Sequence, residues 1–238
     1  MKMLMASDFD GTYRTTRKQL DKNNRAIEKW RAAGNYFGIV TGRGEDFLPK
    51  AKEMGLSFDY LIVYNGSLIL RPDGSHIHEE FIMRDMFVKL EEYFAPVSDC
   101  VYYSKADESE KYFHYYAEMP NPQRALELAE DINGKYGDTI TAFVNGPHIN
   151  IGVKGSGKAE GVGHILECFG LKKENAVVVG DDYNDLEMIS RFNGWSVING
   201  RRAVKKAASH ICLNIASLVK ILLKKQKKNT TRKDISHE

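Results

Sequence analysis

Two aspartates near the start of the chain carry the clearest chemical signal in the sequence. The segment Asp8-Phe9-Asp10-Gly11-Thr12 follows the apolar run Met3–Ala6, which predicts a short buried strand that ends at Gly11. Ligands of open α/β sheets bind just beyond the carboxyl ends of such strands. There one carboxylate can act as a nucleophile and the other as a proton shuttle, while a divalent cation keeps both ionised. The plainer alternative is an acidic turn, because Asp and Gly are ordinary turn residues.

Polar residues also follow two further predicted strands, at the point where each strand ends. The apolar run 36–40 stops at Thr41-Gly42-Arg43, and the run 176–179 stops at the acidic segment Gly180–Asp185. Lys158 stands at the start of the helix predicted before the second run. If these strands are neighbours in one sheet, their polar ends meet in one crevice. Phosphoryl transfer needs little beyond such positioning and the neutralisation of charge.

Each of these residues taken alone has a plainer explanation. Thr41 before a glycine is compatible with turn chemistry, and a single Lys158 is typical of an exposed surface. The pair Asp181-Asp182 could cap the helix that follows it. The functional interpretation therefore depends on their joint occurrence at successive strand ends.

The elements that would position these side chains alternate between strand and helix at both ends of the chain. Asp21 is expected to cap a helix that contains Trp30 and stops at Gly34. A hairpin is expected over 67–81, around Pro72-Asp73-Gly74. The remaining predictions are strands at 61–64 and 195–198 and helices at about 45–54, 158–169, 201–208 and 215–225. This patterning predicts a Rossmann-like α/β core, a parallel sheet with helices on both faces.

The middle of the chain has a different order of predicted elements, with pairs of strands separated by helices. Helices are predicted over about 85–95 and 122–136, and strands over about 100–104, 111–117, 139–144 and 148–153. The stretch is rich in Tyr and Phe, which more often form a core than a ligand site. It reads as an inserted α+β cap domain. We therefore expect a discontinuous core domain, residues 1–82 and 154–238, around a cap of residues 83–153.

Composition narrows the classes of partner. The chain has 238 residues, 42% of them hydrophobic and 28% charged, with a net charge of +2, so nothing global indicates nucleic acid or a membrane. Cys100, Cys168 and Cys212 form no CxxC pair, and the N-terminal apolar run is too short for a secretory signal. A cytoplasmic location is therefore expected. The basic segments Lys224–Lys228 and Arg232-Lys233 are expected to form a solvated, frayed tail, although such runs can bind anionic partners.

Four segments, in order along the chain, resemble the haloacid dehalogenase superfamily. More narrowly, they look like the Cof-type phosphatases with an inserted α/β cap of the second type. The matching motifs are Asp8–Thr12, Thr41 in Val40–Arg43, Lys158 in Lys154–Lys158, and Gly180–Asp185. Asn65-Gly66 and Asn199 also stand where Cof-type members place them. The resemblance covers nearly the whole chain except the cap details and the last dozen residues.

The resemblance implies a Mg²⁺-dependent phosphatase that acts through an aspartyl phosphate. In that scheme Asp8 attacks phosphorus, while Asp10 protonates the leaving oxygen and then deprotonates the attacking water. Thr41 and Lys158 would bind phosphoryl oxygens. The metal would be held by the Asp8 carboxylate, the Asp10 main-chain carbonyl and Asp181, with help from Asp185.

Substrate contacts are the least determined part of this reading. Gly42, Arg43 and Asn184 are further candidates for binding the phosphate or the substrate, and Asn184 is also expected to orient the acidic loop. Tyr13 stands where relatives commonly have Leu, and it could touch the site or merely pack; Asp182 has no assigned role. From the cap, the candidates that could line the crevice are Lys105, His114, Tyr116 and Asn145.

Two other patterns point away from this reading and are set aside. Gly152–Ala159 nearly fits the nucleotide-binding loop GxxxxGK[ST], but Ala159 replaces the hydroxyl that would bind magnesium, and Asp8 would remain unexplained. The seven histidines show no HExxH spacing, and His76 and His78 are expected on a solvated hairpin. The expected substrate is a small phosphorylated metabolite, such as a sugar phosphate or pyridoxal phosphate. A phosphomutase or a non-catalytic binding protein on the same scaffold stays open, as does the choice between monomer and homodimer.

Overall fold

The computed structural model describes residues 2–98, 100–106 and 110–235. The chain divides into two compact units. The first unit comprises Met1–Ile39, Pro49–Tyr60 and Ile165–Glu238, and the second comprises Val40–Leu48 and Leu61–His164. Both units are therefore built from segments that are far apart in the sequence.

The first unit contains a parallel sheet, and one of its inner strands carries the first aspartate motif. Its strand order is β13 (His210–Cys212), β12 (Trp195–Val197), β11 (Ala176–Gly180), β1 (Leu4–Asp8) and β2 (Tyr36–Val40). β1 pairs with β11 in parallel, with Leu4 opposite Ala176 and Ser7 opposite Val179. All five residues of β1 are buried, which explains its apolar sequence before Asp8. The predicted parallel α/β core is confirmed.

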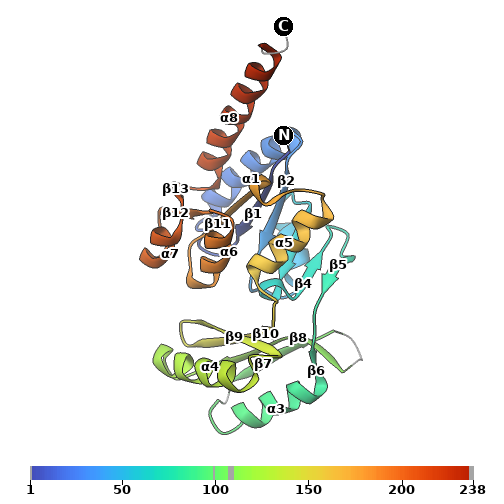
Figure 1. The fold of residues 1–238 in the computed structure, drawn as a ribbon, viewed down its shortest axis with the longest axis vertical. Helices are drawn as coiled ribbons and strands as arrows, with labels where there is room; N and C mark the ends of the chain where they lie inside the picture. The colour runs from blue at the N-terminus through green and yellow to red at the C-terminus, as the bar shows by residue number, and fades with distance from the viewer. Residues whose placement is uncertain (1, 99, 107–109, 236–238) are drawn as a thin grey trace. The chain divides into compact units, whose positions relative to one another are not determined.

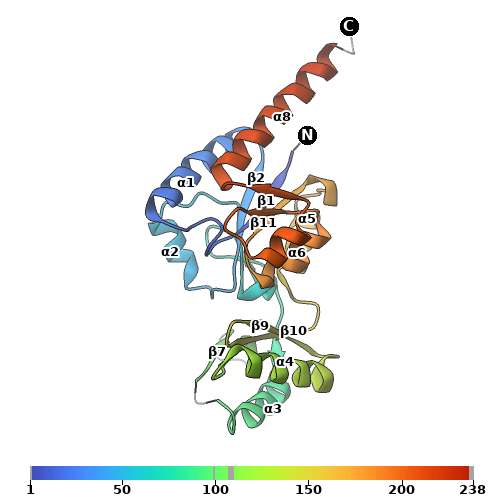
Figure 2. The same cartoon turned by 90° about the vertical axis from the view of Figure 1, so that its left-hand side faces the viewer.

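Helices cover both faces of this sheet. Figure 2 shows α1 (Arg17–Ala32) on one face and α6 (Leu186–Arg191) on the other. α8 (Ile215–Ile235) packs beside α1 and extends beyond the sheet (Figure 1). α7 (Arg202–Ala207) lies between β12 and β13 in the chain. This arrangement buries the sheet on both sides, as all-parallel sheets require.

The second unit contains the predicted hairpin and a separate antiparallel sheet. β3 (Tyr60–Val63), β4 (Leu68–Leu70) and β5 (His76–Glu79) pair antiparallel, with the turn closed by Gly74 N donating to Arg71 O at 2.9 Å. α2 (Phe47–Glu53) begins in this unit and continues into the first unit at Pro49. α5 (Lys158–Cys168) begins in this unit with the third motif.

The antiparallel sheet is covered on one face by helices. Its strands run in the order β6 (Ile82–Met83), β8 (Lys111–Glu118), β10 (His148–Val153) and β9 (Ile140–Asn145), and β7 (Val101–Lys105) also pairs with β8. α3 (Arg84–Phe94) and α4 (Pro122–Tyr136) lie on the same face (Figure 1). The buried core between them includes Phe87, Phe94, Tyr115, Ile132 and Ile149. The aromatic run therefore forms core, as expected, although the cap boundaries at residues 83 and 153 remain a prediction.

Several element boundaries differ from those predicted. α1 begins five residues early, because Thr16 rather than Asp21 caps it: the Thr16 side chain accepts from Gln19 N at 3.1 Å. α8 continues past residue 225 to Ile235, so Lys224–Lys228 are helical rather than frayed. The side chains of Arg232 and Lys233 lie outside the described residues. No helix in the described part of the chain is long and apolar enough to cross a membrane.

Candidate active site

Three carboxylates from two neighbouring strands meet at one edge of the parallel sheet. β1 and β11 lie side by side with Ser7 opposite Val179, so Asp8 and Asp181 leave the sheet at the same edge. Oxygen atoms of Asp8, Asp181 and Asp185 all lie within 4.8 Å of one another. Asp8 is 7% exposed and Asp185 is fully buried. Like charges this close and this far from water favour a bound cation, and hard oxygen ligands suit Mg²⁺.

Asp185 holds the acidic loop in shape. Its Oδ2 accepts from Asp181 N at 2.9 Å and from Asp182 N at 3.1 Å. Asp182 in turn accepts from Tyr183 N at 2.7 Å and caps the short 3-10 turn Tyr183–Asp185. The sequence reading gave the orienting role to Asn184 and none to Asp182. In the structure, these loop hydrogen bonds belong to Asp185 and Asp182.

Two residues to which the sequence analysis assigned no role hold the loop after β1 in place. Thr12 Oγ1 donates to Asp181 Oδ1 at 2.5 Å, and Asn199 Nδ2 donates to Gly11 O at 2.8 Å. Gly11 has a φ of +86°, and a Cβ there would run into the Asp181 carboxylate. The glycine thus permits both the left-handed turn and the close approach of the two loops.

Asp10 and Tyr13 face different surroundings. The Asp10 carboxylate is half-exposed and pairs with Arg14 Nη2 at 3.0 Å. An exposed carboxylate can exchange a proton with substrate or water, which a buried ligand cannot do. Tyr13 is fully buried, and its hydroxyl donates to Asn24 Oδ1 at 2.9 Å, which settles its role as packing. Burial raises the pKa of the Tyr13 hydroxyl well above its ordinary value.

In the second unit, the loop after β2 is joined to the Asn65-Gly66 turn. Thr41 is buried, its Oγ1 accepts from Arg43 N at 3.2 Å, and its carbonyl accepts from Asn65 N at 3.0 Å. Tyr64, Asn65 and Gly66 all have positive φ values, of 50°, 53° and 120°. Such consecutive left-handed residues are costly and are concentrated at functional sites. A Cβ on Gly42 would contact the Asn65 amide at 3.1 Å, so this turn lies directly beside Gly42.

Lys158 belongs to the same cluster of loops. It is the first residue of α5 and only 3% exposed, which is unusual for lysine. The residue before it, Gly157, touches Gly66 so closely that a Cβ on Gly66 would collide with the Gly157 backbone. The Asn65-Gly66 turn therefore connects the segment that carries Thr41 with the one that carries Lys158. That Thr41 and Lys158 lie close to Asp8 stays a prediction from the sequence.

A cavity of about 320 Å³ opens beside Gly42 in the second unit. Loop residues Gly42, Gly44 and Asp46 line it together with aromatic residues of β7 and β8. Two of the cap candidates, His114 and Tyr116, belong to this lining, whereas Lys105 and Asn145 do not. His114 Nε2 donates a hydrogen bond to Asn150 Oδ1 at 3.1 Å, and burial lowers the pKa of its imidazole to about 4. His114 is therefore neutral at physiological pH. The complete lining is Gly42, Gly44, Asp46, Tyr64, Tyr102, Tyr103, Ser104, His114 and Tyr116.

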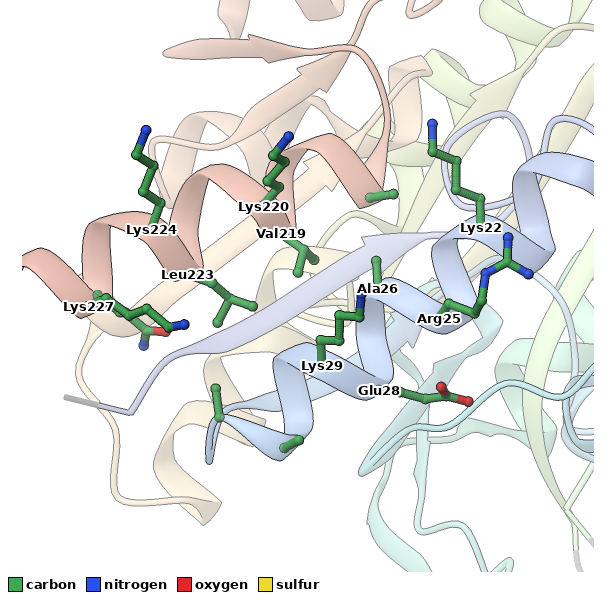
Figure 3. Close-up of a pocket in the computed structure, with 14 residues that line it drawn as sticks. Lys22, Arg25, Ala26, Glu28, Lys29, Val219, Lys220, Leu223, Lys224 and Lys227 are labelled. Carbon is green, nitrogen blue, oxygen red and sulfur yellow. The ribbon is translucent and has the colours of Figure 1, made fainter.

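A larger groove, of about 1480 Å³, runs between α1 and α8 in the first unit (Figure 3). Lysines from both helices, together with Arg25 of α1, border an apolar floor that contains Val219 and Leu223. Its lining includes Lys22, Arg25 and Lys29 of α1 and Lys220, Lys224 and Lys227 of α8. Asp8, Asp181 and Asp185 do not line this groove. It is thus separate from the carboxylate cluster.

Comparison with known proteins identifies the family. The model of the haloacid dehalogenase-like hydrolases matches residues 5–114 and 98–217, which together span most of the chain. This chain belongs to the haloacid dehalogenase-like hydrolase family. The four motifs read from the sequence therefore lie within a hydrolase of that family.

Two curated proteins and many solved structures are similar to this haloacid dehalogenase-like hydrolase. A Bacillus subtilis protein, 5-amino-6-(5-phospho-D-ribitylamino)uracil phosphatase YcsE, is 24% identical over 87% of this chain and 88% of its own length. A Streptococcus pyogenes serotype M6 protein, named for phosphatase and peptidyl-prolyl cis-trans isomerase activities, is 25% identical over 81% of this chain but only 46% of its own length. The chain thus spans about half of that relative. A haloacid dehalogenase-like hydrolase from B. subtilis superimposes with a TM-score of 0.79 at 15% identity, covering 91% of this chain and 97% of that one.

Proposed function

We propose that this hydrolase is a Mg²⁺-dependent phosphatase that acts on a small phosphorylated metabolite through an aspartyl-phosphate intermediate. The observation that carries the proposal is the convergence of the Asp8, Asp181 and Asp185 carboxylates at the ends of two parallel strands. Open α/β sheets bind ligands at this edge. Membership of the family and the phosphatase named among the similar proteins support the same activity.

The donor set fits magnesium. All three side chains offer carboxylate oxygens within 4.8 Å of one another, and Asp181 is held in place by Thr12. Asp8 and Asp181 would bind the ion directly, together with the Asp10 carbonyl, and Asp185 would support them. When bound, Mg²⁺ neutralises charge on the phosphoryl oxygens and keeps the carboxylates ionised.

The reaction would proceed in two displacements. Asp8 attacks phosphorus, its carboxylate oxygen forms a bond to phosphorus, and the bond to the substrate oxygen breaks while Asp10 gives that oxygen a proton. A water molecule then loses a proton to Asp10 and attacks the aspartyl phosphate, which releases inorganic phosphate and restores Asp8. Thr41 and Lys158 would hold the phosphoryl oxygens, with Gly42, Arg43 and Asn184 close to the substrate.

The cavity beside Gly42 supports a small substrate. Its volume of about 320 Å³ is at the lower end of the range for small-molecule sites. Tyr and His side chains from β7 and β8 would contact the part of the substrate that is released as the alcohol. The sequence segment 83–153 would then act as the specificity cap. A cytoplasmic location and the lack of a nucleic-acid or membrane partner are parts of the same proposal.

The test is phosphate release from a panel of phosphorylated metabolites, with Mg²⁺ and with EDTA. The panel includes sugar phosphates, pyridoxal phosphate and the phosphorylated ribitylaminouracil. We expect metal-dependent release that Asp8→Asn abolishes and that Asp21→Asn, a change to an exposed helix residue, leaves intact. Release that survives Asp8→Asn would contradict the assigned nucleophile. No release from any substrate would contradict the proposal, and an isomerised phosphate ester in place of free phosphate would instead identify a phosphomutase.

A further inference from the structure

Three side chains of types that commonly bind metal ions meet in the second unit, and none of them belongs to the four motifs described above. His78 lies on β5, Glu80 follows directly after β5, and His164 lies on α5. Their ligand atoms all lie within 4.8 Å of one another. The histidines are separated by more than eighty positions in the chain, which is why no spacing rule could find them. The sequence reading placed His78 on a solvated hairpin, whereas the structure places it in this cluster.

Glu80 is the centre of the group. Its Oε1 lies 3.1 Å from His78 Nε2 and 4.0 Å from His164 Nε2. The two imidazole rings are stacked, with centroids 3.9 Å apart and an angle of 25° between their planes. Two ring nitrogens and a carboxylate oxygen thus lie close together. Ligand atoms of a tetrahedral zinc ion lie roughly 3.4 Å apart, given bonds of about 2.0–2.1 Å, and the observed separations bracket that value.

Glu80 Oε2 is buried and has no hydrogen-bond partner among the described residues. A buried carboxylate oxygen without a hydrogen-bond donor is costly, because it has lost its hydration and no protein hydrogen bond replaces it. The ring nitrogens beside it can bind a proton or a metal ion. A cation would give the Glu80 carboxylate the partner that it lacks among the described residues.

We propose that His78, Glu80 and His164 form a binding site for a divalent transition-metal ion of the zinc class. Two imidazoles and one carboxylate suit Zn²⁺, Co²⁺ or Ni²⁺ better than Mg²⁺, which prefers oxygen ligands. Water would occupy the fourth position. The three side chains are 24% to 36% exposed, so an ion can reach them from solvent. Glu80 lies just before β6, the first strand of the antiparallel sheet, and His164 lies on α5. The ion would therefore link the segment before β6 to the helix that begins with Lys158.

The test is competition for Zn²⁺ between the metal-free full-length protein and a chromophoric chelator, with excess Mg²⁺ present to occupy the oxygen-rich cluster. We expect one equivalent of Zn²⁺ to bind. Glu80→Gln and His164→Asn should each weaken binding by at least about tenfold, since even the residues that support metal ligands are worth that much. His76→Asn is the matched control: His76 is on the same strand but pairs with Glu79.

A second measurement guards against a variant that merely misfolds. Cobalt bound to two nitrogens and an oxygen in tetrahedral geometry gives intense visible absorption, which the isosteric Glu80→Gln should diminish while its far-ultraviolet circular dichroism stays that of the parent. Zinc binding that is equal in the parent, Glu80→Gln and His164→Asn would overturn the proposal. Failure of the parent to retain zinc against the chelator would overturn it as well. Neither result depends on phosphatase activity, so this proposal and the proposed function can fail separately.

Discussion

At the scale of single residues, the candidate active site depends on the fit between two loops. Gly11 and Asp181 approach so closely that a Cβ at position 11 would displace the Asp181 carboxylate. Thr12 then places a hydroxyl on one oxygen of Asp181, while the backbone of the acidic loop is fixed by Asp185. The geometry of the proposed metal ligands is therefore set in part by hydrogen bonds from neighbouring residues.

The first prediction concerns Gly11. Gly11→Ala should lower phosphatase turnover by about 100-fold or more, because the added methyl displaces the Asp181 carboxylate and small misplacements at a reacting centre are costly. Gly34→Ala is the matched control, since Gly34 has a similar φ of +81° but open space around its Cβ position. Both variants should lose about 1–2 kcal/mol of stability from the strained backbone, measured by urea denaturation. Equal activity losses in the two would contradict the argument.

The second prediction concerns Thr12. Thr12→Val keeps the shape of the side chain but removes the hydrogen bond to Asp181. We expect the Mg²⁺ concentration for half-maximal activity to rise by about tenfold to 100-fold, because the ligand loses the group that orients it. Thr12→Ser restores the hydroxyl and should return that concentration close to the parent's. A Mg²⁺ dependence unchanged in Thr12→Val would show that Asp181 needs no such support.

At the scale of elements, the start of α1 gives a direct comparison between two candidate caps. Thr16→Ala should cost about 1 kcal/mol in unfolding free energy, because the side chain satisfies the free amide of Gln19. Asp21→Ala should change stability by less than about 0.5 kcal/mol, since Asp21 lies inside the helix and makes an exposed pair with Arg17. Urea denaturation of both variants measures the difference. The reverse ranking would return the cap to Asp21.

Most elements could be predicted because their sequence pattern and their environment agree. The buried parallel strands β1 and β11 are continuous apolar runs, and α4 has both a capping Asn121 and an amphipathic pattern. β6 and β13 escaped prediction because two or three residues carry no periodicity, and their strand state comes from pairing with β8 and β12. The end of α8 was missed because a lysine-rich run looks like a tail until its helical packing on α1 is known.

Some features of the candidate site could also be predicted from the sequence, and others could not. The meeting of Asp8 and Asp181 could be predicted because each stands at or just after the end of a recognisable strand, and neighbouring parallel strands bring such residues to one edge. Lys158 begins its helix as predicted, but its place beside Asp8 stays a prediction. Asp185 and Asn184 could not be ranked, because the two stand side by side in the acidic segment and only the hydrogen bonds to Asp181 N and Asp182 N separate them. His78 and His164 were beyond reach, since their meeting depends on the packing of β5 against α5.

At the scale of the whole molecule, the proposed catalytic residues come from both compact units. The carboxylates Asp8, Asp181 and Asp185 belong to the first, whereas Thr41 and Lys158 belong to the second. If Thr41 and Lys158 bind the phosphoryl group as proposed, activity requires both units to be folded. Conditions that destabilise one unit alone should abolish phosphate release before the other unit unfolds.

The pH dependence of stability follows from a histidine in the second unit. Burial lowers the pKa of His114 from 6.5 to about 4. Between these values the unfolded chain binds a proton that the folded protein does not, so the stability present above pH 6.5 is lost as the pH falls. From pH 7.5 to pH 5 the loss from this group should be about 2 kcal/mol.

His114→Gln, which has no proton to gain, should lack that part of the loss, whereas His210→Gln at an exposed strand position should retain it. Urea denaturation of the parent and both variants at the two pH values measures each contribution. If the parent and His114→Gln lose stability in parallel, the buried imidazole is not what makes the second unit sensitive to acid.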